Sequence, residues 1–195
     1  MKETEITVQV FSDIDSTRDR LKEMGYKCTE KYNMHDWYFS KYDTTELLSM
    51  KYIDILNNSF LIREICDPEP RCQLVYKKKL MDNNDNVIQE EKFKADVANS
   101  ADAKNVLTMS GLNNWCYVKN DSEVYSNGKS EIVLQTIEDL GLFIEFEEDE
   151  SMSGMTEKEK FEHMVDIIKS LGLNLATDFS AKKVYMKFLK ENIVK

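Results

Sequence analysis

Two short pairs of carboxylates are the residues in this sequence whose types and spacing point most directly to chemistry. Glu3 and Glu5 are two residues apart near the N-terminus, and Glu145 and Glu147 are two apart in the second half of the chain. On a β-strand, residues at this spacing point to the same face with Cα atoms about 6.5–7 Å apart. Their oxygens can share a hard divalent cation such as Mg²⁺ or Mn²⁺. Taken singly, such a pair is more often plain surface charge.

Basic side chains gather on single faces of three further segments that alternate like strands. One segment carries Gln73, Val75, Lys77 and Lys79 on the same face. The next segment carries Glu90, Lys92 and Lys94 on one face. In a third segment, Arg63 lies on the opposite face from Phe60, Ile62 and Glu64. This alternation leaves two interpretations open. The charged faces are either solvated outer faces, as is usual in antiparallel sheets, or they line an internal tunnel while helices cover the apolar faces.

Other kinds of site find little support. His35 and His163 belong to no Ser/His/Asp or Cys/His arrangement of the kind used in nucleophilic catalysis. The sequence also has no glycine-rich phosphate loop. The four cysteines match no zinc-binding spacing, so we expect reduced, mostly buried thiols. A net charge of −10 argues against sequence-independent binding of nucleic acid, which needs a basic face. It leaves room for a small polyanion in a local basic pocket.

The elements that must position these residues follow one another in hairpin order. We expect strands near residues 3–10, 31–39, 47–51, 58–66, 72–80, 87–97, 115–125, 131–137 and 142–148, with a hairpin loop at 81–86. Four helices are expected: one capped by Ser12, one capped by Ser100 that runs through Ser110, one that begins with a Thr156–Glu159 capping box, and one from about Ser180 to Asn192. The pattern predicts an α+β fold with an antiparallel, closed or nearly closed β-barrel of about eight strands. Its charged faces would form a tunnel, with the helices packed outside.

Domain organisation and location follow from composition. No stretch resembles a linker, so residues 1–195 are expected to form a single domain. No apolar run approaches 18 residues, which excludes an ordinary membrane span. The N-terminal residues alternate charged and apolar types and do not form a signal peptide. We therefore expect a cytoplasmic protein with no membrane or nucleic-acid partner; the sequence does not give the oligomeric state, and a dimer is possible.

An ordered set of motifs covers nearly the whole chain. Its members are Glu3-Thr4-Glu5, Asp36-Trp37-Tyr38-Phe39, Phe60-Leu61-Ile62-Arg63-Glu64, Val75-Tyr76-Lys77, the segment from Leu140-Gly141 to Glu145-Phe146-Glu147, and Lys182-Lys183-Val184-Tyr185. This set resembles the CYTH family of triphosphate tunnel enzymes, which includes class IV adenylyl cyclases and thiamine triphosphatases. The resemblance implies that Glu3, Glu5, Glu145 and Glu147 hold Mg²⁺ or Mn²⁺. It also implies that a triphosphate is bound by Arg63 and Lys77, with Lys79, Lys92, Lys94 and Lys183 as further candidates.

The activity implied by the resemblance is that of a metal-dependent phosphohydrolase acting on a small triphosphate, such as tripolyphosphate, a nucleoside triphosphate or thiamine triphosphate. One alternative is a class IV-type adenylyl cyclase that forms cyclic AMP and pyrophosphate. Another is a degenerate family member that binds a triphosphate or nucleotide without turnover. The sequence identifies no catalytic group.

Several positions depart from the family pattern. Thr7 stands where the family has lysine, Leu61 where it has the first arginine, and Gln135 where an aspartate is usual. The strand that holds Lys92 and Lys94 has its charges exchanged relative to the family motif. These replacements keep the binding-only alternative open.

Overall fold

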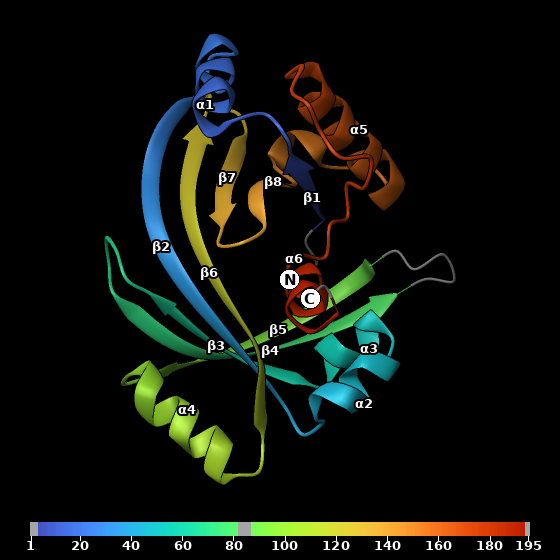
Figure 1. Ribbon diagram of the computed structural model, residues 1–195. Helices are drawn as coiled ribbons and strands as arrows, with labels where there is room; N and C mark the ends of the chain where they lie inside the picture. Colours follow the sequence, from blue (N-terminus) through green and yellow to red (C-terminus); the bar gives the residue numbers. More distant parts are fainter. Residues whose placement is uncertain (1–3, 82–86, 194–195) are drawn as a thin grey trace. The chain divides into compact units, whose positions relative to one another are not determined.

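The computed structural model describes residues 4–81 and 87–193, so Glu3 and residues 82–86 of the predicted hairpin loop lie outside the described residues. The strands are β1 (Glu5–Val10), β2 (Lys27–Ser40), β3 (Ser59–Ile65), β4 (Arg71–Met81), β5 (Val87–Val97), β6 (Asn113–Ser126), β7 (Glu131–Ile137) and β8 (Gly141–Glu147). The helices are α1 (Ile14–Glu23), α2 (Thr44–Ser49), α3 (Tyr52–Asn57), α4 (Ser100–Met109), α5 (Glu157–Ser170) and α6 (Lys183–Asn192), with a short 3₁₀ turn η1 (Glu150–Met152). Figure 1 shows these elements along the chain.

The eight strands follow the hydrogen-bonded order β1-β8-β7-β6-β2-β3-β4-β5. The pairs β1–β8, β8–β7, β7–β6, β2–β3, β3–β4 and β4–β5 are antiparallel. This confirms the predicted α+β class and antiparallel sheet. Among the described residues the order has ends at β1 and β5, so the sheet is not closed and a barrel is not confirmed.

The chain divides into two compact units, each described by itself below. Of the described residues, unit 1 contains 33–119 and 184–193, and unit 2 contains 4–32 and Asn120–Lys183. The long strands β2 and β6 contribute one half to each unit. That residues 1–195 act as a single domain stays a prediction.

In unit 2, the sheet has one apolar face, which packs against α1 and α5 (Figure 1). The strand register aligns Val8 with Ile144, and Ile144 with Leu134, so one apolar row crosses three strands. Leu21 of α1 and Ile168 of α5 are fully buried against this face. Because strand side chains alternate, the residues between these apolar positions must lie on the opposite face.

The edge of β1 that β8 leaves open is covered by residues 174–181, here called the edge segment. Its backbone hydrogen bonds to β1 are Phe11 N to Asn174 O (2.8 Å), Ala176 N to Gln9 O (2.9 Å), Thr7 N to Phe179 O (3.0 Å) and Ala181 N to Thr7 O (2.9 Å). Both sides of β1 are therefore held by backbone hydrogen bonds.

In unit 1, the sheet likewise has an apolar face, and α4 packs on it (Figure 1). Phe39 of β2, Ile62 of β3 and Leu107 of α4 form the buried centre of this contact. Helix α6 packs through Phe188, whose ring meets the edge of Trp115 at a centroid distance of 5.2 Å. In both units, helices thus cover the apolar faces, as the sequence predicts.

The helices depart from the sequence-based expectation in one respect. Residues 44–49 form α2 rather than part of a strand at 47–51, and the described residues contain six α-helices where four were expected. The signal that was missed is a capping box: Asp43 accepts from the backbone of Glu46, whose side chain accepts from the backbone of Asp43. The predicted Thr156–Glu159 box is present, whereas α1 and α4 are capped one residue away from the predicted positions, by Asp13 and Asn99.

Membrane insertion through a helix finds no support in the described part of the chain, where every helix is too short or too polar to cross a bilayer.

Candidate functional site

Three glutamates of unit 2 come together on the polar face of β1 and β8. Glu5 is directly opposite Glu147, and Thr7 is opposite Glu145. Glu5, Glu145 and Glu147 each offer one carboxylate oxygen, and these oxygens lie within 4.8 Å of one another. We call these three residues the carboxylate site.

The apolar core fixes this arrangement from behind. Ile6 and Phe146, which neighbour the glutamates in sequence, are buried and face the core. A slip of one residue in either strand would turn these apolar side chains out and the glutamates in, which the buried face forbids. The donor set fits a hard divalent cation, because Mg²⁺ and Mn²⁺ prefer carboxylate oxygens and the three oxygens are close enough to share one ion. The site therefore suits the metal that the sequence predicts.

Lys183, the first residue of α6, reaches the same face. Its ammonium donates to Oε1 of Gln135 at 2.6 Å and also contacts Oε2 of Glu145. The side chains of Lys183 and Glu145 are 21% and 19% exposed, so solvent screens this ion pair only partly. Lys183 is thus a direct neighbour of the carboxylate site.

The polar face continues from the carboxylates into buried positions. Thr7, Ser122 and Gln135 are at most 5% exposed although each is polar. Ser122 lies directly opposite Gln135 across β6 and β7. A fully solvated outer face, one of the two interpretations of the sequence, would leave such side chains exposed.

In unit 1, four lysines share one face of β4 and β5. Lys77 is directly opposite Lys92, while Lys94 faces Val75 and so lies on the same side. Lys79, two residues after Lys77, also shares that side because of strand alternation. We call Lys77, Lys79, Lys92 and Lys94 the lysine face. The register confirms that Lys92 and Lys94 share one face of β5.

Arg63 of β3 is held by a carboxylate that the sequence did not single out. Its Nε and Nη2 donate to Oδ1 and Oδ2 of Asp36 at 2.9 and 2.7 Å. Asp36 is directly opposite Arg63 on β2 and is buried. Such a two-point contact fixes the plane of the guanidinium group. Asp36 belongs to the Asp-Trp-Tyr-Phe motif, but nothing in the sequence indicated its partner.

Another carboxylate, Glu123 of β6, lies on the opposite, packed face of the unit 2 sheet. It accepts from Arg18 Nη2 at 2.6 Å, Lys31 Nζ at 2.9 Å and the Tyr125 hydroxyl at 2.8 Å. Burial by itself would raise the pKa of Glu123, but these hydrogen bonds outweigh it and lower the pKa from 4.5 to about 2. This cluster ties α1 and β2 to β6 and has a structural role.

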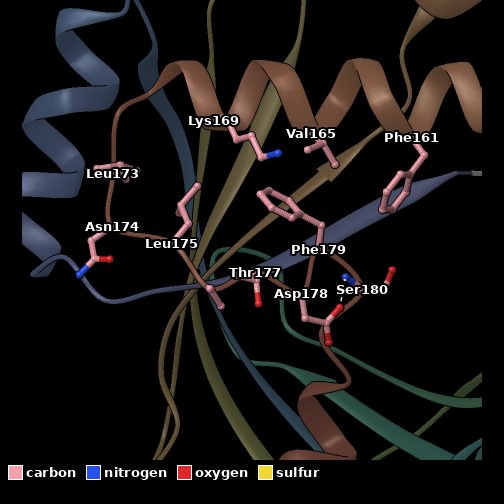
Figure 2. A pocket seen from close by; sticks show the side chains of 11 residues that line it. Phe161, Val165, Lys169, Leu173, Asn174, Leu175, Thr177, Asp178, Phe179 and Ser180 are labelled. Atoms are coloured by element: carbon pink, nitrogen blue, oxygen red, sulfur yellow. Dashed lines mark hydrogen bonds between the residues drawn. The ribbon is translucent and has the colours of Figure 1, made fainter.

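A separate cavity of about 740 Å³ lies between α5 and residues 173–180 (Figure 2). Phe161 and Val165 of α5 point toward Leu175 and Phe179, and Lys169 Nζ is 5.5 Å from the centre of the Phe179 ring. None of the described residues predicted to bind metal or triphosphate lines it. This cavity is therefore not the site that the motifs predict.

The predicted site residues fall into two sets. Unit 2 brings together Glu5, Glu145, Glu147 and Lys183; unit 1 holds Arg63, Lys77, Lys79, Lys92 and Lys94. Glu3 lies outside the described residues. The assignment of the glutamates to metal, and of Lys183, Arg63 and the lysine face to triphosphate, stays a prediction. Sequence reasoning missed Asp36 as the partner of Arg63 and Gln135 as a partner of Lys183.

Comparisons with known proteins bear on the whole chain. No family model matches it. A protein of Methanocaldococcus jannaschii with the name "Putative adenylate cyclase" is 26% identical over 188 residues, which cover 96% of this chain and 98% of that protein.

Two solved structures share the fold. A protein of Pyrococcus horikoshii superposes with a TM-score of 0.66 at 18% identity and covers 96% of this chain and 98% of its own. A Hippeastrum protein, described as a "putative adenylyl cyclase" with a dominant triphosphatase activity, superposes with a TM-score of 0.61 at 12% identity and covers 98% and 97%. In sequence and in fold, over nearly its whole length, this chain resembles the CYTH family.

Proposed function

We propose that this protein is a metal-dependent enzyme that hydrolyses a small triphosphate. The observation that carries the proposal is the carboxylate site, in which three glutamate oxygens lie within 4.8 Å of one another. Support comes from the full-length similarity to a relative with a cyclase name and from the fold shared with a protein described as a triphosphatase.

In this proposal, Glu5, Glu145 and Glu147 hold Mg²⁺ or Mn²⁺, with Glu3 as a further ligand. The ion, when bound, would neutralise negative charge on phosphate oxygens. The glutamates themselves orient the ion and keep it on one face of β1 and β8. Thr7, opposite Glu145, lines the same face but has no charge to add.

The lysine face supplies the positive charge that a triphosphate needs. Lys77 and Lys92 are directly opposite each other, so both could contact one phosphate group bound on this face.

Arg63 adds a donor of fixed orientation. Asp36 takes two of the five N–H donors of its guanidinium group and thereby sets the direction of the others. Lysine ammonium groups act as point charges, whereas arginine can bind two phosphate oxygens at once. We propose that Arg63 positions the triphosphate and that the lysines neutralise it.

The test is orthophosphate release from tripolyphosphate, ATP, GTP and thiamine triphosphate with Mg²⁺ or Mn²⁺. Glu147→Gln removes one charge from the carboxylate site at an exposed position and should lower the rate on the order of 100-fold. Glu162→Gln removes an exposed carboxylate of α5 outside the site and should leave the rate unchanged. Release that needs no metal, or equal rates for both variants, would contradict the proposal.

A second candidate is adenylyl cyclisation, which the name of the M. jannaschii relative favours. Cyclic AMP and pyrophosphate, rather than orthophosphate, would then be the products from ATP. Chromatography of the products separates the two reactions. If neither product forms while calorimetry detects tripolyphosphate binding, the protein is a binding protein, which agrees with the replacements at Thr7 and Leu61.

A further inference from the structure

The acidic residues at the end of β8 are divided between the two faces of the unit 2 sheet. Glu145 and Glu147 belong to the carboxylate site, whereas Glu148, the next residue, contacts α5. Its Oε2 accepts from Lys160 Nζ of α5 at 2.7 Å. Because α5 packs on the apolar face, the side chain of Glu148 turns away from the carboxylate site. Glu148 is thus joined to the helix behind the site.

The start of β1 is held by the same turn of α5. Thr4, the residue before Glu5, donates from its hydroxyl to Oε2 of Glu157. The backbone joins the two strand ends, because the Glu148 amide donates to the Thr4 carbonyl at 2.9 Å. Glu157 and Lys160 are three residues apart and share one side of the helix. We call Thr4, Glu148, Glu157 and Lys160 the strand-end clamp.

The clamp is anchored at its helical end and partly sheltered from water. The backbone amide and the hydroxyl of Thr156 both donate to Oε2 of Glu159 at 2.7 Å, which fixes the first turn of α5. The side chains of Lys160 and Glu148 are 16% and 21% exposed, so solvent screens their ion pair only partly. Burial by itself would raise the pKa of Glu148, but the hydrogen bonds from Lys160 and Thr4 outweigh it and lower the pKa. The Glu148 carboxylate therefore stays charged and paired at neutral pH.

The clamp lies one residue beyond Glu5 and Glu147, which form the outermost pair of the described β1–β8 register. The ends of strands open more easily than their centres. The separation of these two carboxylates therefore depends on what holds the strand ends together. Metal affinity in turn depends on how well the groups around the ligands fix their positions.

We propose that Lys160 is a positioning residue for the carboxylate site: by binding Glu148 it keeps the paired ends of β1 and β8 together and so sets the separation of Glu5 and Glu147. The inference rests on the proposed function, because it assumes that these glutamates bind a metal ion. Charge and positioning predict opposite results when Lys160 is replaced. Loss of a nearby positive charge would by itself strengthen cation binding, whereas loss of positioning weakens it.

The first experiment titrates Mn²⁺ alone into the full chain by calorimetry, at a temperature where every variant is folded. Lys160→Met should weaken binding by about tenfold, since the ligands are no longer held at a fixed separation. Lys160→Arg keeps a cation at this position and should retain most of the affinity. Lys158→Met removes the same charge from an exposed position of α5 and should not weaken binding.

The second experiment follows amide hydrogen exchange by NMR without metal, which tests the strand ends directly. In Lys160→Met the Glu148 amide should exchange about tenfold faster than in the wild type. The Ala176 amide, which donates to Gln9 of β1, should exchange at an unchanged rate. Thr4→Val removes the other side-chain contact of the clamp and should cause the same changes to a smaller extent. It keeps the inference testable if Lys160→Met fails to fold.

Unchanged exchange at Glu148 in Lys160→Met would overturn the inference, and so would Mn²⁺ affinity equal to or higher than that of the wild type. Equal acceleration at Ala176 would show that Lys160 only stabilises the unit as a whole. If the wild type binds no Mn²⁺, the proposed function is contradicted, while the exchange rates still decide whether Lys160 holds the strand ends. Weaker Mn²⁺ binding by Lys160→Met, without orthophosphate release by the wild type, would support the inference and contradict the proposed hydrolysis.

Discussion

The two faces of the unit 2 sheet give their glutamates opposite electrostatic environments. On the packed face, Glu123 accepts four hydrogen bonds from three residues, Arg18, Lys31 and Tyr125. On the polar face, three carboxylates lie close together, and Lys183 donates to one of them, Glu145. A carboxylate with a surplus of donors stabilises the fold. A group of carboxylates with a surplus of negative charge costs stability and favours a bound cation.

Metal affinity should distinguish the two faces most strongly. Glu147→Gln should weaken Mn²⁺ binding on the order of 100-fold, because a ligand and its charge are lost. Glu123→Gln should leave Mn²⁺ affinity unchanged, since that side chain lies on the other face. Calorimetry measures both; a similar loss in the two variants would refute the division of roles.

For stability the order of the two variants should be reversed, with Glu123→Gln the more strongly affected. Glu123→Gln should lower the free energy of unfolding by about 2 kcal/mol, because Arg18 and Lys31 lose a sheltered partner. Urea denaturation at neutral pH without metal measures this. The interpretation of Glu123 as structural fails if Glu123→Gln is as stable as the wild type.

The stability that Glu123 contributes should depend on pH. The folded pKa of Glu123 is about 2, below its usual 4.5, so the unfolded chain takes up a proton first as the pH falls. The stability contributed by this carboxylate is present above pH 4.5 and is lost as the pH falls toward 2. The gap between the wild type and Glu123→Gln should therefore shrink across that interval, as followed by urea denaturation at successive pH values. A constant gap would show that the charge of Glu123 is not its cause.

The lysine face allows a control within a single strand. Lys77→Gln should weaken tripolyphosphate binding by about tenfold, or about 1.4 kcal/mol. Lys78→Gln removes the same charge one residue along, on the other face of β4, where Lys78 is opposite Glu91. That variant should change affinity much less. Calorimetry that gives equal losses would mean that only net charge matters.

The smallest expected effect is on the metal-free protein. Glu147→Gln relieves repulsion among the three carboxylates and should raise the free energy of unfolding by about 0.5 kcal/mol. Thermal unfolding in the presence of a chelator measures it. Added Mg²⁺ should then stabilise the wild type more than the variant, since the ion binds only the folded state. A variant less stable than the wild type under chelation would argue for a structural role of Glu147.

Much of the fold could be predicted from alternation alone. Strands with one apolar face, such as the one that contains Ile144 and Phe146, were placed within a few residues, because the core tolerates only one register. Helix α3 could not be predicted, since Lys51 caps it without a side-chain hydrogen bond and it is only six residues long. Closure of the sheet could not be derived from local patterns either.

The candidate site was predictable only in part. Glu145 and Glu147 are conspicuous because they are close in sequence. The partners of Lys183 lie 38 and 48 residues away, and no local pattern encodes such a distance. The same holds for Asp36 and Arg63, which are 27 residues apart. Tertiary ion pairs need the sheet order before they can be recognised.

The pairing of β1 has a consequence for synthesis on the ribosome. Strand β1 emerges early, but its two neighbours, β8 and the edge segment, are both made much later. Until then its backbone has open edges on both sides, which are prone to pair with other chains. Glu5 reaches its partners only when those neighbours dock. Assembly of the carboxylate site is thus one of the late events in the maturation of each newly made chain.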